Sequence, residues 1–308
     1  MGIPNLTGRD LLSLADLTPT EMTELLTVAQ ALKQGELRPT CPHVLGLLFY
    51  KASTRTRVSF SVAMYQMGGQ VIDLNPQVTQ VGRGEPLIDT ARVLDRYLDI
   101  LAVRTFAQAD LQTFANYAEI PVINALTDLE HPCQILADLL TIQEEFDTLQ
   151  GLTLTYLGDG NNVAHSLLLG CAMAGMNIKV ATPADYAPDP AVVQQAQSLA
   201  LPGTKIQILT DAEAAVTDAH VLYTDVWASM GQEDLAAARI PIFAPYQINE
   251  ALMAKADPGA IALHCLPAHR GEEISEGVME GPQSRIWDQA ENRMHAQKAL
   301  MACLLGAV

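Results

Sequence analysis

The chain has 308 residues, enough for two compact domains of about 150 residues each. Its formal net charge of -17 argues against a nucleic-acid-binding surface, which needs clustered Lys and Arg, although a few local arginines can still bind a small anion. Five scattered cysteines without a CxxC pair, an N-terminal segment unlike a signal peptide and no apolar run of about 18 residues together predict a soluble, cytoplasmic protein with no membrane partner.

The first half of the chain alternates short apolar runs with helical patterns, which is typical of a parallel sheet. Apolar residues at helical spacing predict helices over 19–34, 58–67, 90–97 and 131–146. Short apolar runs predict strands at 46–50, 70–74, 99–103 and 121–123.

The second half repeats this alternation and closes on an apolar-faced helix. Its predicted strands are 152–157, 177–182, 205–209, 220–224 and 260–265. Its predicted helices are 163–174, 190–200, 212–218 and 288–305. We therefore expect an α/β protein of two domains, each with a central, mainly parallel sheet flanked by helices, and an active site in the interdomain cleft. The domain boundary is predicted near residue 148, and the second domain is predicted to span 149–287.

The densest cluster of polar groups is the segment Lys51-Ala52-Ser53-Thr54-Arg55-Thr56-Arg57, between a predicted strand and a predicted helix. Hydroxyls, guanidinium groups and the free N–H groups of a helix start are the donors that a phosphate dianion needs. Two arginines near a helix N-terminus oppose the helix dipole, which favours a compensating anion. The alternative is an N-capped helix with a solvated basic first turn.

The segment FYKASTRTRVSF resembles the carbamoyl-phosphate signature of the aspartate and ornithine carbamoyltransferase family, whose core is S-T-R-T. The resemblance extends along nearly the whole chain. It implies that Ser53, Thr54, Arg55 and Thr56 bind carbamoyl phosphate, and that no metal or other cofactor is used. Arg57 is expected to be structural and to pair with a buried carboxylate.

Two further segments carry the same resemblance in the first domain. Arg104, at the end of a predicted strand, corresponds to a family arginine that reaches carbamoyl phosphate. The segment HPCQ is similar to the family's H-P-x-Q motif, which implies that His131 and Gln134 contact the carbamoyl group. A neutral or cationic His131 can stabilise an oxyanion. For a lone histidine, a helix cap with Gln134 as its capping-box partner would be the simpler interpretation.

The resemblance also implies that two residues outside these segments, Gln80 and Arg293, contribute to carbamoyl-phosphate binding. Gln80 is expected to reach the phosphate site of a neighbouring subunit, which implies a homotrimer or a higher multiple. Some relatives carry a lysine where this chain has Gly84, so no lysine contact is expected from that loop. Arg293 is expected to bind carbamoyl phosphate, with residues 288–308 packing back on the carbamoyl-phosphate-binding domain, residues 1–148.

The second domain carries motifs for an amino-acid substrate. Asn161 or Asn162, after a predicted strand, offers a side-chain amide to a carboxylate, and the family's G-D-x-N-N pattern favours Asn162. The segment DVWASMG resembles the D-x-x-x-S-M-G loop of ornithine carbamoyltransferases, which implies ornithine binding by Asp225, Ser229 and Met230. A solvated aspartate at a strand end is the alternative interpretation of Asp225.

The segment HCLPAHRG is similar to the family's H-C-L-P motif. It implies that backbone carbonyls of Cys265 and Leu266 accept hydrogen bonds from the carbamoyl group, and that Leu266-Pro267 is a candidate cis bond. A buried, inert thiol is the alternative for Cys265. His264 and Cys265 should point to opposite faces of a strand, so we do not expect them to form a metal site with His269.

Together these motifs predict transfer of the carbamoyl group from carbamoyl phosphate to the δ-amine of ornithine. The expected catalytic residues are Arg55, Arg104, His131, Asp225 and Cys265. Another amine, such as putrescine or acetylornithine, is an alternative acceptor. A nucleotide-dependent dehydrogenase fits the α/β alternation but lacks the G-x-G-x-x-G fingerprint. A non-catalytic anion-binding protein would bind carbamoyl phosphate without releasing phosphate when ornithine is added.

Overall fold

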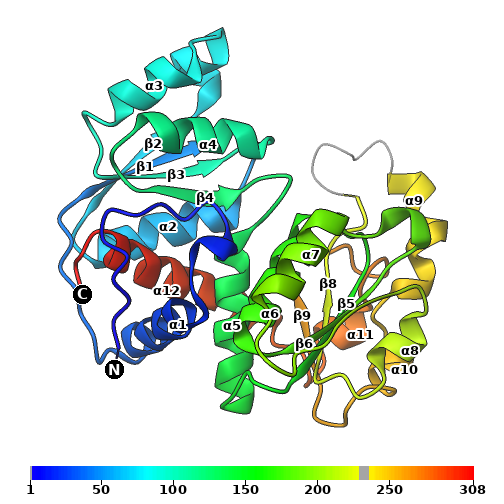
Figure 1. Cartoon of the computed structure of the whole chain (residues 1–308). Coiled ribbons are helices and arrows are strands. Elements are labelled where there is room, and N and C mark those ends of the chain that lie inside the picture. The colour runs from blue at the N-terminus through cyan, green and yellow to red at the C-terminus, as the bar shows by residue number, and fades with distance from the viewer. Residues whose placement is uncertain (1, 229–235) are drawn as a thin grey trace. The chain divides into compact units, whose positions relative to one another are not determined.

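The computed structural model describes residues 2–228 and 236–308. The chain forms two compact units: unit 1 contains residues 1–140 and 291–308, and unit 2 contains residues 141–290. None of the helices in the described ranges combines the length and the apolar character that a bilayer crossing requires. Each unit is built around its own parallel sheet, and the two units are described in turn (Figure 1).

The sheet of unit 1 has the strand order β2-β1-β3-β4, and all neighbouring strands are parallel. Its strands are β1 (Val44–Phe49), β2 (Gln70–Leu74), β3 (Ile100–Arg104) and β4 (Val122–Leu126). Every residue of β3 is buried, as expected for a central strand covered on both faces. The edge strand β2 is largely half-buried or exposed.

Helices cover both faces of this sheet (Figure 1). They are α1 (Pro19–Gln34), α2 (Thr54–Gln66), α3 (Leu87–Leu94), α4 (Gln108–Tyr117), α5 (Pro132–Phe146) and α12 (Ile286–Leu304), of which α5 and α12 each cross from one unit into the other along the chain. Leu111 and Phe114 of α4 pack with Leu101 and Val103 of β3 on one face. Short 3-10 helices lie at η1 (Leu14–Asp16), η2 (Pro76–Val78) and η3 (Gln80–Arg83).

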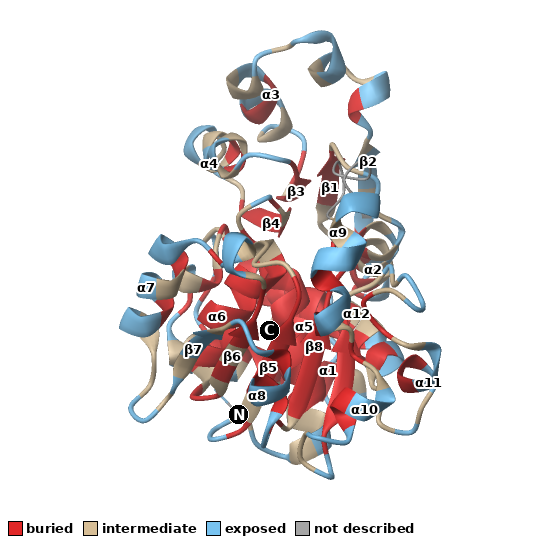
Figure 2. Ribbon diagram, turned by 90° about the vertical axis from the view of Figure 1, so that its right-hand side faces the viewer, coloured by how far each residue is buried: buried red, intermediate tan, exposed pale blue. Residues whose placement is uncertain are grey.

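The sheet of unit 2 has the order β7-β6-β5-β8-β9 and is also parallel throughout. Its strands are β5 (Thr153–Leu157), β6 (Asn177–Ala181), β7 (Ile206–Leu209), β8 (Val221–Thr224) and β9 (Ile261–His264). All residues of β8 and of the edge strand β9 are buried, and Figure 2 shows β8 in red. An apolar cluster including Leu157, Leu222 and Phe243 fills one face of the sheet.

The helices of unit 2 lie on both faces of its sheet, with α6 and α7 on one side and α8, α10 and α11 on the other (Figure 1). Their bounds are α6 (Asn162–Ala174), α7 (Pro190–Leu199), α8 (Ala212–Val216), α9 (Ala236–Phe243), α10 (Glu250–Met253) and α11 (Glu276–Met279), with 3-10 turns η4 (Ala184–Tyr186) and η6 (Ala244–Tyr246).

The predicted fold class, two α/β domains with parallel sheets, is confirmed. Helix 19–34 has the predicted bounds because Thr18 and Glu21 form a capping box and Gly35 ends the helix at φ 76°. Two predicted starts were wrong. Helix α2 begins at Thr54, not at residue 58, because Ser53 is its N-cap. Helix α3 spans Leu87–Leu94 and not 90–97.

Several short elements were missed. Helix α4 was not predicted, although its buried Leu111 and Phe114 are three residues apart, a spacing that helices use to bury one face. Helices α9, α10 and α11 were also missed, and the last two have only four residues each, too few for a periodic pattern.

The order of the strands determines where a ligand can bind. In unit 1 the chain moves outward from β1 to β2 and then returns to the other side of β1 to form β3. In unit 2 it moves outward from β5 to β7 and returns to the other side of β5 as β8. Open parallel sheets bind ligands at the carboxyl ends of the strands on either side of such a reversal. The relevant strand ends are those of β1 and β3 in unit 1, and of β5 and β8 in unit 2.

Candidate active site

The S-T-R-T motif begins α2 directly after β1, at the strand reversal of unit 1. Ser53 is the N-cap residue, but its side chain makes no capping hydrogen bond in the described structure. Thr54 is exposed, Arg55 is half-buried and Thr56 is buried. The interpretation as an ordinary capped helix is therefore not supported, because the cap that it requires is not made. The first-turn N–H groups retain their capacity to bind an anion.

Arg293 connects α12 to this motif. Its guanidinium donates one hydrogen bond to Gln134 Oε1 at 2.5 Å and another to the Thr56 hydroxyl at 3.2 Å. Gln134 in turn donates to Asp138 Oδ1 at 2.8 Å. Arg293, Gln134 and Thr56 are all at least 97% buried. Three of the predicted residues, from α2, α5 and α12, are thus joined directly.

Three arginines act on the buried ring of His131. The pKa of His131 lies well below its usual value, first because burial penalises the charged ring. The positive charges of Arg293, Arg104 and Arg55 lower this pKa further. His131 is therefore neutral, which decides between the two protonation states left open by the sequence. Because the neutral ring adds no charge to the guanidinium groups nearby, a dianion at this position would meet a strongly positive field.

The structure does not bring every predicted residue of unit 1 into this cluster. Gln80 begins η3 with an exposed side chain, which makes no hydrogen bond to the cluster within the described part of the chain. Arg57 forms an ion pair with Asp73, as expected of a structural arginine, but the prediction that its carboxylate partner is buried was wrong. Asp73 lies on the edge strand β2, and its side chain is 49% exposed.

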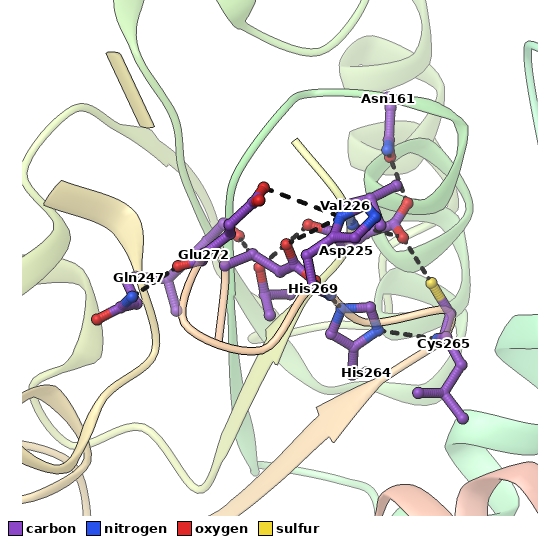
Figure 3. A network of polar contacts seen from close by, with 12 residues as sticks. Asn161, Asp225, Val226, Gln247, His264, Cys265, His269 and Glu272 are labelled. Carbon is purple, nitrogen blue, oxygen red and sulfur yellow. Dashed lines mark hydrogen bonds and ion pairs between the residues drawn. The ribbon is translucent and has the colours of Figure 1, made fainter. Parts of the chain in front are cut away.

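Asp225 is the centre of the polar groups in unit 2. It follows β8 directly and is 93% buried. Its Oδ1 atom accepts hydrogen bonds from the Val226 N–H at 2.8 Å and from the Cys265 thiol at 2.9 Å. Its Oδ2 atom accepts one from the Asn161 side-chain amide at 2.9 Å. Figure 3 shows Asn161 and Cys265 both directed at this carboxylate. The solvated-aspartate interpretation was therefore wrong.

The two asparagines after β5 have different environments. Asn161 is the N-cap of α6: its Oδ1 accepts from the N–H groups of Val163 and Ala164, while its Nδ2 binds Asp225. Both ends of this amide are therefore used to position other groups. Asn162, the first residue of α6, is half-buried. The role of Asn162 in binding a ligand stays a prediction.

The H-C-L-P segment is held by a buried histidine at the end of β9. His264 Nδ1 accepts a hydrogen bond from the Leu266 N–H at 2.8 Å, so this nitrogen carries no proton. The other ring nitrogen, Nε2, must then donate to Glu273 Oε1 at 3.0 Å. Leu266 has a positive φ of 59°, and the Leu266-Pro267 bond is cis, as predicted. His264 and Glu273 thereby fix the backbone next to Cys265.

Arg239 makes an ion pair and a backbone hydrogen bond that the sequence did not predict. Arg239 of α9 donates to Asp159 Oδ2 and to the backbone oxygen of Trp227, each at 2.6 Å. The pKa of Asp159 is raised by burial, an effect that Arg239 partly opposes. Neither residue carried a usable sequence signal, because they are 80 positions apart. Ser229 and Met230, predicted to bind ornithine, lie outside the described residues.

Comparisons with known proteins match both units. Residues 9–144 match the family model described as the carbamoyl-P binding domain of aspartate/ornithine carbamoyltransferase. Residues 150–304 match the model described as the Asp/Orn binding domain of the same family.

Relatives and solved structures cover nearly the whole chain. A protein from Synechocystis sp. named ornithine carbamoyltransferase is 71% identical over 308 residues, all of both chains. The crystal structure of ornithine carbamoyltransferase from Gloeobacter violaceus is 60% identical, with a TM-score of 0.89, and the match covers 96% of this chain and 98% of that one. The enzyme from Pyrococcus furiosus is 48% identical with a TM-score of 0.95, over 99% and 100% of the two chains. The chain therefore belongs to the aspartate/ornithine carbamoyltransferase family.

Proposed function

We propose that this protein transfers the carbamoyl group of carbamoyl phosphate to the δ-amine of L-ornithine, giving L-citrulline and phosphate. The observation that carries the proposal is the convergence of three arginine charges, from α2, β3 and α12, on the buried, neutral His131. The relatives named ornithine carbamoyltransferase, up to 71% identical over the full chain, support the choice of substrates.

In this proposal, unit 1 binds carbamoyl phosphate, the donor of the carbamoyl group. Hydroxyls and N–H groups from Ser53 to Thr56 bind the phosphate at the start of α2, where the helix dipole also favours an anion. Arg55, Arg104 and Arg293 neutralise its charge, and Gln134 contacts the carbamoyl group. His131 donates a hydrogen bond from its neutral ring to the carbonyl oxygen, which becomes negative as the amine attacks.

Unit 2 binds the amine in this proposal. Asn162 holds the α-carboxylate of ornithine, and the Asp225 carboxylate faces its cationic end. The backbone oxygens of Cys265 and Leu266 are assigned to the carbamoyl NH2 group. Ser229 and Met230, outside the described residues, keep their predicted role in ornithine binding.

The chemical step forms a C–N bond and breaks a C–O bond. The neutral δ-nitrogen attacks the carbonyl carbon, the oxyanion forms, and phosphate leaves with the electrons of the C–O bond. An alkyl ammonium titrates near pH 10, so the amine must lose a proton before attack. The Asp225 carboxylate binds the ammonium form, which releases this first proton to solvent. After the attack the nitrogen carries a second excess proton, and the departing phosphate accepts that one. Because the amine attacks the carbamoyl carbon, the two bound substrates must lie in contact. An active site between the two domains would allow this contact and remains a prediction.

A citrulline assay with four amines tests the proposal. Ornithine should be turned over far faster than putrescine, acetylornithine or aspartate. Asp225→Asn keeps the shape of the side chain but removes its charge, so kcat/KM for ornithine should fall roughly 100-fold, which corresponds to about 3 kcal/mol. Binding of carbamoyl phosphate, measured by calorimetry, should not change. Faster turnover of another amine, or no phosphate release with any amine, would overturn the assignment.

A homotrimer with shared active sites is part of this proposal. Apolar side chains are exposed on α2, β2 and η2, next to the η3 turn that carries Gln80, at Val58, Tyr65, Ile72 and Val78. Such a surface suits contact with a second copy of the chain. Arg55→Ala and Gln80→Ala trimers should each be inactive, whereas subunit exchange between them should restore some activity. Failure of the exchanged mixture to regain activity would contradict a shared site.

We also assign the protein to arginine biosynthesis in the cytoplasm. None of the five cysteines, all within the described ranges, forms a disulfide, which suits a reducing compartment. Growth without arginine in a strain that lacks this gene tests the assignment. The strain should need arginine or citrulline, and ornithine should not replace them.

A further inference from the structure

A second group of charged side chains lies on the loop after β9. The donor atoms of His269, Glu272 and Glu273 all lie within 4.8 Å of one another. His269 Nδ1 is 4.0 Å from Glu272 Oε2 and 3.7 Å from Glu273 Oε2. These distances exceed those of hydrogen bonds, but one cation between the three atoms would be close to all of them. Figure 3 shows His269 and Glu272 in this network.

Glu273 gives independent evidence for a ligand at this position. Its side chain is fully buried, and Oε1 accepts hydrogen bonds from His264 and from the His269 N–H. Its other oxygen, Oε2, is buried without a hydrogen-bond donor among the described residues. Its ion-pair partner, His269 Nδ1, is 3.7 Å away, too far for a hydrogen bond. A buried carboxylate oxygen without a hydrogen bond is costly, and a bound cation would remove that cost.

The loop is held in a fixed shape around this oxygen. The Gln247 side-chain amide donates to the backbone oxygens of Gly271 and Glu272, at 2.9 and 2.7 Å. The Ile248 N–H donates to the Glu273 backbone oxygen at 2.9 Å. The side chains of His269 and Glu272 are 55% and 40% exposed, so they can adjust around an ion that enters from solvent.

We propose that His269, Glu272 and Glu273 form a binding site for a divalent transition-metal ion, with zinc as the best match. One imidazole and two carboxylates are a ligand set that zinc accepts, with water in the fourth position. Tetrahedral zinc places its ligand atoms about 3.4 Å apart, so His269 needs to approach each carboxylate oxygen by only about half an ångström. The hydrogen bond from His264 to Glu273 orients the carboxylate, as groups around metal ligands commonly do.

This site is separate from the groups assigned to the reaction. The donor atoms of Asp225, His264 and Cys265 also lie within 4.8 Å of one another. However, His264 uses Nδ1 to accept from Leu266 and Nε2 to donate to Glu273. Binding a metal through His264 would break one of these bonds. The proposal does not depend on carbamoyl transfer, and the expectation of a metal-free reaction stays a prediction.

Calorimetric titration of the metal-free full chain with zinc chloride tests the proposal. His269→Ala should remove one zinc site, and Glu272→Gln should weaken it roughly 10-fold or more. His43→Ala is the matched control, because His43 also faces a carboxylate, Asp99 at 3.3 Å, with similar exposure but no third ligand within the described ranges. His43→Ala should bind zinc like the natural sequence. Equal zinc binding by the natural sequence and His269→Ala would overturn the proposal.

The absorption spectrum of bound cobalt(II) distinguishes an ion held by His269, Glu272 and Glu273 from an ion held by Asp225, His264 and Cys265. An ion held by imidazole and carboxylates gives no thiolate charge-transfer band, and its spectrum should persist in Cys265→Ser. Zinc should also raise the Tm of the natural sequence but not that of His269→Ala. A cobalt spectrum with a thiolate band that survives in His269→Ala and disappears in Cys265→Ser would place the ion on Cys265 and refute the assignment.

Discussion

Arg293 donates a hydrogen bond to Gln134, which lies 159 positions earlier in the chain, and its second nitrogen reaches Thr56. A single planar guanidinium therefore joins the last helix to the helices that carry the H-P-x-Q and S-T-R-T motifs. Lysine has one compact charge and cannot donate in both directions with the same geometry.

Arg293→Lys should lower kcat/KM for carbamoyl phosphate roughly 100-fold, because lysine cannot keep both hydrogen bonds, to Gln134 and to Thr56, that hold the proposed carbamoyl-phosphate site together. Arg285→Lys is the matched control. Arg285 binds Glu145 with two hydrogen bonds of 2.7 Å at the partly exposed surface of unit 2, and its other hydrogen bonds go to the backbone oxygens of Pro282 and Ser284. Steady-state kinetics at saturating ornithine measure both variants. Equal losses in the two variants would show that any arginine exchange disturbs the protein.

Loss of the Arg239 side-chain charge should impair ornithine binding specifically. Arg239 joins Trp227 and Asp159, and residues 229–235 follow Trp227 in the chain. Arg239→Gln should raise the KM for ornithine by roughly 10-fold or more, since a partly buried charge pair loses one partner. The KM for carbamoyl phosphate should remain the same. A rise in the carbamoyl-phosphate KM alone would contradict this role.

Cys265 should be the cysteine that reacts first with thiol reagents. Cys41, Cys133, Cys171 and Cys303 are buried, and Cys265 is half-buried. Burial also raises the pKa of Cys133 and of Cys303 to about 12, which keeps these thiols protonated and unreactive. Iodoacetamide should therefore modify one thiol rapidly, and activity should fall at the same rate. Peptide mass spectrometry identifies the modified residue.

Two variants make the thiol experiment decisive. Cys265→Ala should lose the rapid phase, whereas Cys41→Ala should keep it. Ornithine analogues bound together with carbamoyl phosphate should slow the modification. A rapid phase that persists in Cys265→Ala would show that another cysteine is accessible in solution.

His131 should make the protein less stable in acid. Its folded-state pKa is lowered, so below about pH 6.5 the unfolded chain binds a proton that the folded chain rejects. This contribution to stability is fully present above the unfolded-state pKa and declines as the pH falls towards the folded-state value. The decline is at most about 1.4 kcal/mol per pH unit. The His131→Gln variant should lack this loss of stability in acid. Its Tm should therefore fall less between about pH 7 and pH 5 than that of the natural sequence.

His43→Gln is the control for this pH experiment, because the His43 side chain is 39% exposed. It should keep the acid sensitivity of the natural sequence. Parallel pH profiles for the natural sequence and His131→Gln would show that other groups cause the acid sensitivity.

The sequence alone determined the fold class and most of the proposed site residues. Strands β1 and β3 read as continuous apolar runs because they are covered on both faces, and α1 has its own caps. The motifs are local: S-T-R-T, H-P-x-Q and H-C-L-P each carry several functional groups within a few residues. These motifs can be recognised in the sequence because residues close together in the chain lie at one strand end or in one helix turn.

The tertiary structure decided the protonation states and side-chain pairings that depend on residues far apart in the sequence. The neutral state of His131 follows from burial and from arginines on three different elements. The link from Arg239 to Asp159 and the buried pair of His264 and Glu273 join residues whose types are unremarkable in sequence. Charge, desolvation and hydrogen bonding act through space over a few ångströms. Only folding brings these groups that close, so sequence spacing could not reveal them.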